Sequence, residues 1–328
     1  MAEAVSTQPA AALNQRRVLA GLDEVGLGPI LGPMVIGGVA LEGPAGGDPW
    51  RLLRRLVCRD RTEKGKVRVA DSKKVHKGGH QLGPIEHTAL AFVGAWHGSL
   101  PATLAELLRM LGVDPAPLAH CPWYGALELP LPIDNDPGEL ELLAHRLRRE
   151  LEAKQIELLR LALRVVDVEE FNALIDATDN KSDTHFSAYA DVLGGLLEAV
   201  RGRRGHVVAD RCGGRFHYRN TLRRRWPDTR IVVIDEQPEC SEYLLGEEGD
   251  ETRLTFAEKA DGRAFPTALA SCLAKFVREA MIRCLNAWFR ARLPDLEPTA
   301  GYYVDGHRFL AAVRNVPDVP WERLVRSR

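Results

Sequence analysis

Long uncharged apolar stretches are missing from this chain of 328 residues, aromatic residues make up only 6% of it, and its formal net charge is −1. The longest nearly uncharged apolar run, residues 29–41, is too short to span a bilayer and is broken by glycines and prolines. Residues 1–15 lack the basic start and the long apolar centre of a signal peptide. The sequence therefore predicts a cytoplasmic protein that makes no contact with a membrane.

Cysteine is also sparse, and the six cysteines contain no C-x-x-C pair and no zinc-ligand spacing. This pattern excludes a disulfide scaffold. Buried thiols in a reducing compartment are the simplest interpretation of cysteines placed in this way.

The remaining composition, with 45% hydrophobic and 27% charged residues, is typical of a globular protein with a sizeable core. We expect residues 1–16 to form a disordered tail and residues 17–328 to form one folded domain. Residues 97–160 are predicted to be an insertion, because their first half is rich in proline and their second half, from Glu139, has the pattern of a charged helix. Residues 236–252 are predicted to form an acidic loop or hairpin.

Charge is distributed unevenly along the chain, although its sum is close to zero. Residues 201–225 hold nine arginines and one acid, and residues 51–77 hold eleven lysines or arginines. Residues 235–251 hold eight acids and no base. The basic stretches could form a nucleic-acid footprint, or they could be solvated helix faces, and the sequence leaves both open.

Apolar periodicity predicts an α/β fold with a mixed sheet, because strands come first and then alternate with helices. A stripe of apolar residues over 265–288 predicts a long core helix whose polar face carries Lys275, Arg278 and Glu279. Residues 161–168 fit either a strand or a helix end, and a further helix is predicted over 188–200. Short apolar runs predict the strands, which are residues 18–22, 34–41, 206–209 and 231–234, with 89–96 as a further candidate.

Four acidic residues stand where an α/β fold presents function. Asp23 and Glu24 end the first predicted strand, Asp210 ends the strand 206–209, and Asp261 precedes the long helix. Adjacent side chains of a strand point to opposite faces, so we expect the backbone to leave the strand at Asp23. The four carboxylates form a set of oxygen ligands suited to Mg²⁺ or Mn²⁺. With basic stretches nearby, a phosphodiester is the natural substrate.

Each of these acids also has a simpler explanation. Asp261 could act only on the helix dipole. Asp210 could pair with the surrounding arginines, and Asp23 could begin a turn. The functional interpretation therefore depends on the four residues acting together.

Six motifs follow one another along the chain. They are AGLDEVGLGPILGPMV from residue 20, VADSKKV from 69, FNALIDAT from 171, HVVAD from 206, KADGRAFPTALASCLAKFVRE from 259, and Ala300-Gly301-Tyr302. In this order they resemble the motifs of ribonuclease HII, the type 2 ribonuclease H, and they identify the chain as a divergent member of that family.

The resemblance implies a ribonuclease H-like α/β fold, with a mixed β-sheet flanked by helices and with insertions. It implies an endonuclease that hydrolyses the RNA strand of RNA–DNA hybrids with two Mg²⁺ or Mn²⁺ ions and without an obligate protein partner. It makes Asp23, Glu24, Asp210 and Asp261 the catalytic residues and the metal ligands. The nucleic-acid contacts that it implies are Gly26, Leu27, Gly28, Ser72, Lys73, Lys74, Ser271, Lys275 and Tyr302.

Three departures from the family pattern concern substrate choice. Gly26-Leu27-Gly28 stands where the family has G-R-G, a segment that works with the later tyrosine to sense the 2′-hydroxyl. Arg211 or Arg215 could replace the missing arginine. The insertion doubles the usual spacing between the second and third motifs, and the stretch between Asp210 and Asp261 is enlarged. The related ribonuclease HIII family, which also lacks that arginine and whose TKA segment resembles residues 258–260, is a nearby alternative.

Two other classes of function stay open. One is a nuclease of the same fold that cuts another nucleic acid, such as a DNA junction. The other is a nucleic-acid binder without activity, which the four acids disfavour because clustered negative charge beside phosphates weakens binding.

Overall fold

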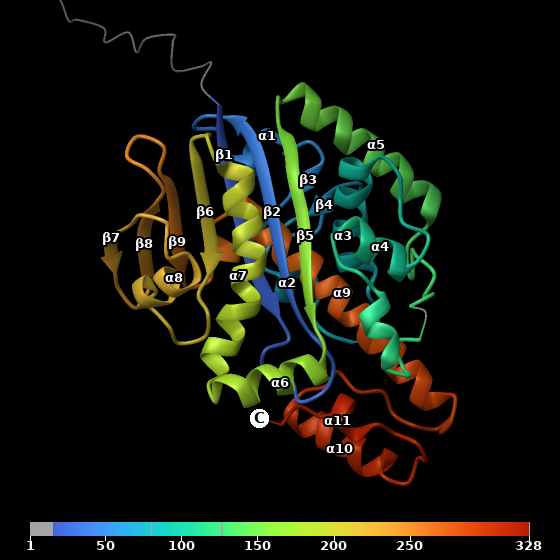
Figure 1. Cartoon of the computed structure of the whole chain (residues 1–328). Coiled ribbons are helices and arrows are strands. Elements are labelled where there is room, and N and C mark those ends of the chain that lie inside the picture. Colours follow the sequence, from blue (N-terminus) through green and yellow to red (C-terminus); the bar gives the residue numbers. More distant parts are fainter. Residues whose placement is uncertain (1–15, 80, 126, 328) are drawn as a thin grey trace, which may run out of the picture.

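The computed structural model describes residues 16–79, 81–125 and 127–327. Its centre is a seven-stranded sheet (Figure 1). Along the sheet the strands are β5 (Glu157–Val166), β2 (Met34–Pro44), β1 (Arg16–Val25), β6 (Gly205–Asp210), β9 (Thr252–Ala257), β8 (Cys240–Leu245) and β7 (Ile231–Glu236). β1 runs parallel to β6, and β6 runs parallel to β9, whereas the outer pairs are antiparallel. The predicted mixed sheet is confirmed.

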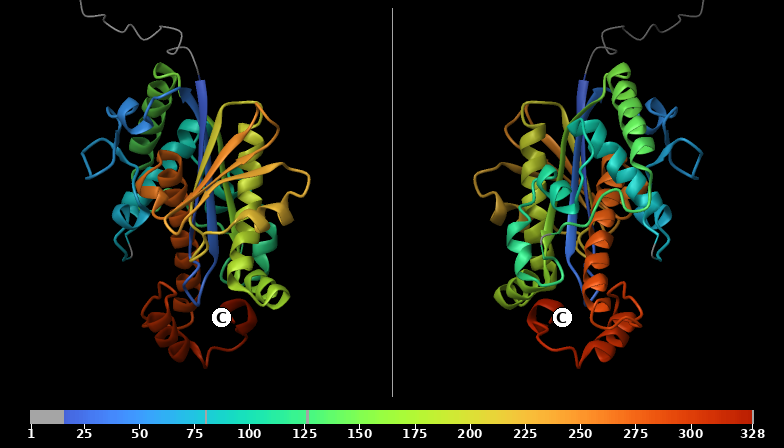
Figure 2. Two further views of the ribbon diagram at one scale, coloured as in Figure 1. Left: turned by 90° about the vertical axis from the view of Figure 1, so that its left-hand side faces the viewer. Right: turned by 90° about the vertical axis from the view of Figure 1, so that its right-hand side faces the viewer.

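Helices cover both faces of this sheet (Figure 2). α7 (Lys181–Val200) packs on one face, with α6 (Val168–Thr178) beside it. α9 (Phe265–Arg290) packs on the other face, where α3 (Gly83–His97) and α5 (Pro137–Ala153) form a further layer. The predicted α/β fold with a sheet flanked by helices is therefore confirmed.

Shorter elements connect these layers. They are α1 (Pro49–Leu52), β3 (Val57–Cys58), β4 (Val67–Arg68), α2 (Ser72–Val75), α4 (Leu104–Met110), η2 (Ala116–His120), α8 (Arg219–Arg225), η3 (Ala260–Gly262), α10 (Tyr303–Val313) and α11 (Trp321–Leu324). Among the described residues, no helix combines the length and the apolarity that crossing a membrane requires.

Alternate side chains of β1 face two hydrophobic cores, one on each side of the sheet. Val18, Ala20 and Leu22 are fully buried in the core on the α7 side, whereas Gly21 faces α9. A Cβ atom on Gly21 would lie 2.3 Å from the backbone nitrogen of Thr267, and one on Gly37 would lie 2.3 Å from the carbonyl oxygen of Ala270. These two glycines therefore let α9 lie directly against the sheet.

Three sequence predictions need correction or extension. The candidate strand 89–96 is wrong, because these residues lie in α3. Residues 89–95 of α3 are all buried, so this apolar run lacks the helical period that would have distinguished it from a strand. Residues 161–166 belong to strand β5, and the helix predicted over 188–200 begins earlier, at Lys181.

The segment boundaries also differ from the prediction. Arg16 belongs to β1, and the rest of the predicted tail, residues 1–15, lies outside the described residues. Residues 157–160, at the end of the predicted insertion, are the start of β5. The segment 236–252, predicted to be an acidic loop or hairpin, carries β8, which forms antiparallel hairpins with β7 and β9 and widens the sheet.

The predicted polar face of α9 is wrong. Lys275, Arg278 and Glu279 are 8%, 0% and 9% exposed, although all three carry charge. The Glu279 carboxylate accepts hydrogen bonds from Lys275 Nζ at 2.7 Å and from Arg278 Nη1 at 2.8 Å. Because each charge has an opposite partner, the three can stay buried together.

Candidate active site

Asp23 and Asp210 lie side by side where two parallel strands end. Leu22 and Ala209 form the last β1–β6 pair, and the next residue on each strand is one of these acids. On β1, alternation turns Asp23 towards the α9 side, where it is 6% exposed. Ala260, just before α9, donates its backbone N–H to Asp210 Oδ1 at 2.8 Å, which fixes that carboxylate against the start of α9.

Glu24 reaches the same place from the other face of the sheet. It stays in β1 and pairs with Ile36, so the expectation that the backbone leaves the strand at Asp23 is wrong. Nevertheless, carboxylate oxygens of Asp23, Glu24 and Asp210 lie within 4.8 Å of one another. This is possible because β1 runs past the last β6 pair, which leaves that edge of β1 open for both side chains.

Asp261 belongs to the same charged neighbourhood. It lies in η3, and its negative charge raises the pKa of both Asp23 and Asp210. Burial, together with the charge of Asp71, raises the pKa of Asp261 itself. The structure thus places all four predicted acids in one region, with Asp23, Glu24 and Asp210 as its tightest group.

Burial and mutual repulsion oppose ionisation of this cluster. Burial, with the charges of Glu24 and Asp210, raises the pKa of Asp23 well above its ordinary value, against a side-chain hydrogen bond with Ser271. Burial also raises the pKa of Asp210 to about 7, with contributions from Glu24 and Asp261. Carboxylates that repel one another in this way gain from a divalent cation between them.

A pH dependence follows for the metal-free protein. The pKa of Asp210 is about 7 in the folded state against an ordinary 3.8, so the folded state binds this proton more tightly. Its contribution to stability is full below about pH 4 and is lost as the pH rises through about 7, and it amounts to a few kcal/mol at about 1.4 kcal/mol per pKa unit. Denaturant unfolding in chelator between pH 4 and 8 should show this decline, and Asp210→Asn should make it shallower, with Asp23 and Asp261 accounting for the decline that remains. An equally steep decline in the variant would contradict the assignment.

Ser72, Ser271 and Lys73 surround the acids from the α9 side. The hydroxyls of Ser72 and Ser271 are buried and lie 2.9 Å apart. Asp71 caps α2 by accepting the backbone N–H of Lys73 at 2.9 Å. The Lys73 side chain is exposed, yet its charge lowers the pKa of Asp210, so it lies close to the acids. Lys74 is exposed beside it, and its charge acts on Asp261.

Two residues of α7 complete the site, and the sequence analysis missed both. His185 is 1% exposed, and its Nε2 lies 3.5 Å from Glu24 Oε2. The Tyr189 hydroxyl lies 3.1 Å from the Leu22 carbonyl oxygen and 2.8 Å from that of Asp210, so it bridges the ends of β1 and β6. The predicted helix began at 188, which left His185 outside it and gave Tyr189 no role.

Arg326 holds the glycine loop after β1, residues 26–32, by hydrogen bonds to its backbone. Its Nη1 donates to the carbonyl oxygens of Gly26 at 2.5 Å and Leu27 at 3.3 Å, and its Nη2 donates to Gly32 at 2.8 Å. The guanidinium also lies 4.4 Å from the ring centre of Phe171. Gly26 has φ +96°, a conformation that favours glycine, so both the backbone and Arg326 fix the loop.

Tyr302 lies next to this loop through Arg278. The Arg278 guanidinium lies 5.5 Å from the Tyr302 ring centre and donates to the Ala300 carbonyl oxygen at 2.8 Å. The Gly301 carbonyl oxygen in turn accepts the backbone N–H of Ile30 in the loop at 2.8 Å. Tyr302 is 47% exposed, so its ring is available at the surface beside the loop.

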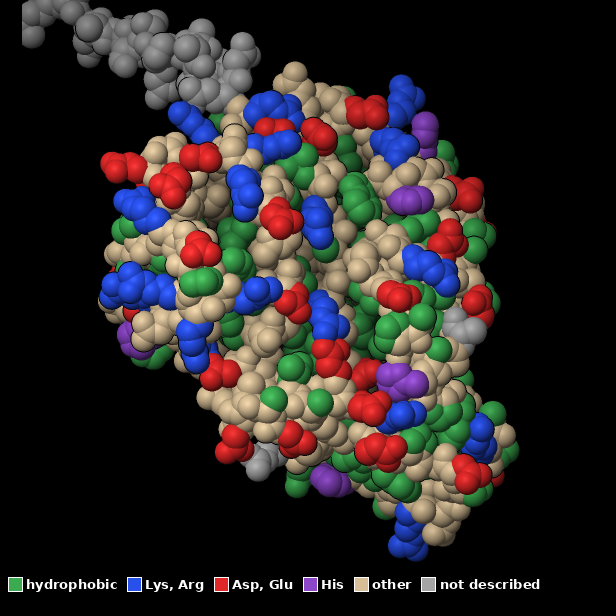
Figure 3. Space-filling view, viewed as in Figure 1, with side chains coloured by type: hydrophobic (Ala, Val, Ile, Leu, Met, Phe, Trp, Pro, Cys, Tyr) green, Lys and Arg blue, Asp and Glu red, His purple; other side chains and the backbone are tan. Residues whose placement is uncertain are grey.

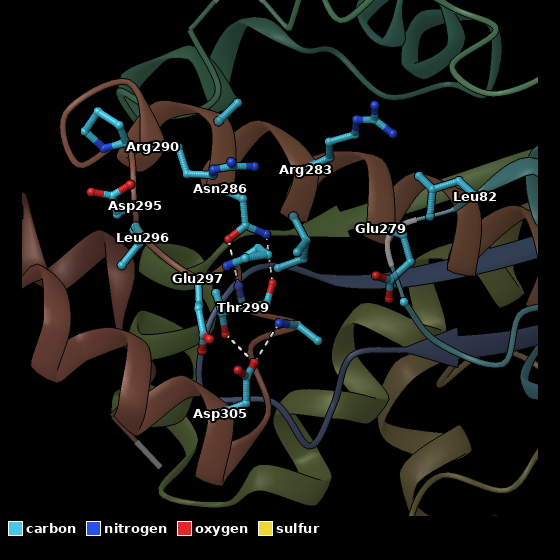
Figure 4. Close-up of a pocket in the computed structure, with 16 residues that line it drawn as sticks. Leu82, Glu279, Arg283, Asn286, Arg290, Asp295, Leu296, Glu297, Thr299 and Asp305 are labelled. Atoms are coloured by element: carbon cyan, nitrogen blue, oxygen red, sulfur yellow. Dashed lines mark hydrogen bonds between the residues drawn. The ribbon is translucent and has the colours of Figure 1, made fainter.

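The segment before Tyr302 is braced along a cavity of about 770 Å³ beside α9 (Figure 4). Asn286 exchanges two hydrogen bonds of 2.8 Å with the backbone of Thr299. Asp305 accepts from the Thr299 hydroxyl at 2.6 Å and from the Ala300 N–H at 2.7 Å. These hydrogen bonds fix the segment that carries Tyr302.

Lys275, which was predicted to contact a phosphate, is buried and hydrogen-bonded to Glu279.

The donor set of the cluster fits divalent cations. It consists of carboxylates, and Glu24 Oε2 is buried without a hydrogen-bond partner among the described residues. Hard cations such as Mg²⁺ and Mn²⁺ prefer such oxygen ligands. A cation would also relieve the repulsion that raises the pKa of Asp23 and Asp210.

Neither a family model nor a curated protein matches the chain. Solved structures do match it. RNase HII from Archaeoglobus fulgidus, solved in complex with PCNA, is 16% identical with a TM-score of 0.43, and the match covers 95% of this chain and 94% of that one. Bst-RNase HIII in complex with Mn²⁺ is 15% identical with a TM-score of 0.44, over 99% of this chain and 72% of that one. The ribonuclease H2 from Pyrococcus horikoshii OT3 is 12% identical with a TM-score of 0.37, over 92% and 91%.

These structures carry the name of the family that the sequence motifs resemble, together with its HIII relatives.

Proposed function

We propose that this chain is a cytoplasmic, divalent-metal-dependent endonuclease that hydrolyses the RNA strand of RNA–DNA hybrids. The observation that carries the proposal is the convergence of Asp23, Glu24 and Asp210 within 4.8 Å, with Asp261 nearby. Phosphodiester hydrolysis by two ions needs such a cluster of oxygen ligands. The motif resemblance supplies the substrate class.

Asp23, Glu24, Asp210 and Asp261 would hold two Mg²⁺ or Mn²⁺ ions. When bound, the ions supply an activated water and stabilise the departing 3′-oxygen. Tyr189 joins the ends of β1 and β6 by its two hydrogen bonds, and His185 lies 3.5 Å from the Glu24 carboxylate.

The substrate would meet the chain's own groups around this cluster. Lys73 and Lys74 are exposed beside the acids, where they can bind phosphates. Backbone groups of the glycine loop and the ring of Tyr302 lie where a ribose could be contacted. In this arrangement the residues place the scissile phosphate, and water carries out the proton transfers.

A cleavage panel tests the proposal. It contains an RNA–DNA hybrid, double-stranded RNA, a DNA junction and a DNA duplex with one ribonucleotide, each with Mg²⁺, with Mn²⁺ and with chelator. The expected result is that the RNA strand of the hybrid is cut fastest, that double-stranded RNA and the DNA junction are not cut, and that chelator abolishes cleavage. Cleavage of the junction would show a nuclease of other specificity, and binding without cleavage of any substrate would show a non-enzymatic binder.

We expect poor cleavage at an isolated ribonucleotide, because Leu27 replaces the family arginine. The two candidate replacements are occupied elsewhere, since Arg211 donates to the Pro238 carbonyl oxygen and Arg215 pairs with Asp183 at 2.5 Å. A lost charge-assisted hydrogen bond is worth about 1.5–3 kcal/mol, or about one to two decades in rate. The long hybrid should be cut that much faster than the single-ribonucleotide duplex, and Leu27→Arg should narrow the gap whereas Leu27→Met should not. Equal rates in the parent would refute this expectation.

The basic stretch 201–225 is a weaker candidate for the nucleic-acid interface than its composition suggests. Arg203 pairs with Glu42, Arg215 with Asp183, and Arg225 with Asp191. On the face seen in Figure 3, lysines and arginines are interspersed with acids. Several arginines of this stretch thus have acidic partners, and phosphate binding is assigned to Lys73 and Lys74 beside the acids.

A further inference from the structure

A second group of metal-ligating side chains lies far along the chain from the acidic cluster. His120 ends η2, Cys121 follows it, and Asp167 stands between β5 and α6. One ligand atom of each residue lies within 4.8 Å of the other two. Nothing in the proposed nuclease activity uses these residues.

The carboxylate of Asp167 is already oriented for this role. Its Oδ1 accepts the backbone N–H of Glu170 at 2.8 Å, so it caps α6. Its Oδ2 lies 3.4 Å from His120 Nε2. The helix cap thus fixes Oδ1 of Asp167 and leaves Oδ2 facing the His120 imidazole. In metal sites, hydrogen bonds of this kind orient the residues that bind the metal.

Glu169 lies at the rim of the group, beside His120. Its Oε2 lies 3.0 Å from His120 Nε2. Arg323 of α11 lies 3.0 Å from the same oxygen and donates to the His120 carbonyl oxygen at 2.9 Å, so it fastens both residues from outside. The carboxylates of Asp167 and Glu169 outweigh the single charge of Arg323, which favours a cation.

Burial gives the group a closed side and an open side. Cys121 is fully buried and Asp167 is 5% exposed, whereas the His120 side chain is 37% exposed. A metal ion could therefore enter past the imidazole and still be shielded from water on the side of the thiol.

We propose that His120 Nε2, Cys121 Sγ and Asp167 Oδ2 form a zinc site, with Glu169 beside His120. A nitrogen, a sulfur and carboxylate oxygens are the donors that Zn²⁺ takes in tetrahedral sites, whereas Mg²⁺ takes oxygen alone. Binding replaces the S–H bond of Cys121 by a Zn–S bond and releases the proton to solvent. The site joins η2 of the 97–160 segment to the β5–α6 corner and, through Arg323, to α11.

Cobalt substitution of the full chain tests this assignment. The purified protein is stripped with a chelator and titrated with Co²⁺, which gives a thiolate-to-cobalt charge-transfer band only when a cysteine is a ligand. We expect one equivalent of Co²⁺ to produce the band, and Zn²⁺ to abolish it by displacement. Cys121→Ser should lack the band, whereas Cys284→Ser and Asp210→Asn should keep it.

A second variant guards against misfolding of Cys121→Ser. His120→Ala changes a partly exposed side chain, so its fold should persist, which circular dichroism can check. Zinc should raise the melting temperature of the chelator-treated parent by more than that of His120→Ala, in which, among the described residues, only the acidic cluster can still bind it. The absence of a band and of a zinc-dependent shift in the parent, or a band that survives in Cys121→Ser, would overturn the proposal and leave a hydrogen-bonded ion-pair group.

Discussion

Asp210→Asn is expected to lower cleavage of an RNA–DNA hybrid by more than about 100-fold and to make the metal-free protein more stable above pH 7. Loss of groups that merely orient metal ligands costs about 10–100-fold, and Asp210 is proposed to be a ligand itself. Its carboxylate lies within 4.8 Å of those of Asp23 and Glu24. The gain in stability follows because the amide replaces a buried carboxylate. In the folded state the pKa of this carboxyl group is about 7, so it is charged above pH 7.

The combination of lost activity and gained stability distinguishes a metal ligand from a structural residue. Hydrolysis of a labelled hybrid with Mg²⁺ or Mn²⁺ measures the first, and denaturant unfolding in chelator measures the second. Asp228→Asn, at an exposed position outside the site, is the matched control and should change neither. A fully active Asp210→Asn, or a parent that is active in excess chelator, would rule out the metal site proposed here.

Gly37→Ala is expected to reduce both stability and activity. Its Cβ would lie 2.3 Å from the Ala270 carbonyl oxygen of α9, where nothing flexible can give way. Overpacking of this kind costs about 1–3 kcal/mol or more. Gly37 pairs with Asp23 across the strands, so a shift of α9 would also separate Ser271 from Asp23, and a misplacement of about 1 Å can cost about 100-fold in rate.

Gly43→Ala provides the control, because it is the same change in the same strand. The nearest atom to its Cβ, on Ile156, would lie at an ordinary contact distance of 3.4 Å. Unfolding free energies and hybrid cleavage rates of the two variants should therefore diverge. If both are equally stable and active, the close approach of α9 to the sheet is not what holds the site together.

The sequence could predict the parts of this molecule whose signals are local. Asp23 and Asp210 follow short β-branched or apolar runs, and the stripe over 265–288 marks α9. The order of these elements was enough to expect a mixed sheet with acids at one rim. What the structure adds is that Glu24 reaches this rim without leaving β1.

The parts that could not be predicted depend on contacts between distant segments. The charges of Lys275 and Glu279 look solvated on a helical wheel, and only the packing around α9 shows that they are buried as partners. His185 acts through Glu24, which lies on a different element, so no local pattern marks it. Residues 89–95 of α3 are all buried, which removes the polar positions that would have shown the helical period.

The contact between Arg326 and the glycine loop bears on when a growing chain becomes competent. The contact joins residues 300 positions apart, and Leu31 pairs with Val325 beside it. The ribosome makes the loop early and Arg326 late. Bringing two residues so far apart in the chain together has an entropic cost. A nascent chain that already contains all four acids therefore lacks the guanidinium that fixes its loop. Full order beside the acidic cluster comes only after residue 326 has been made and has folded back onto the first strand.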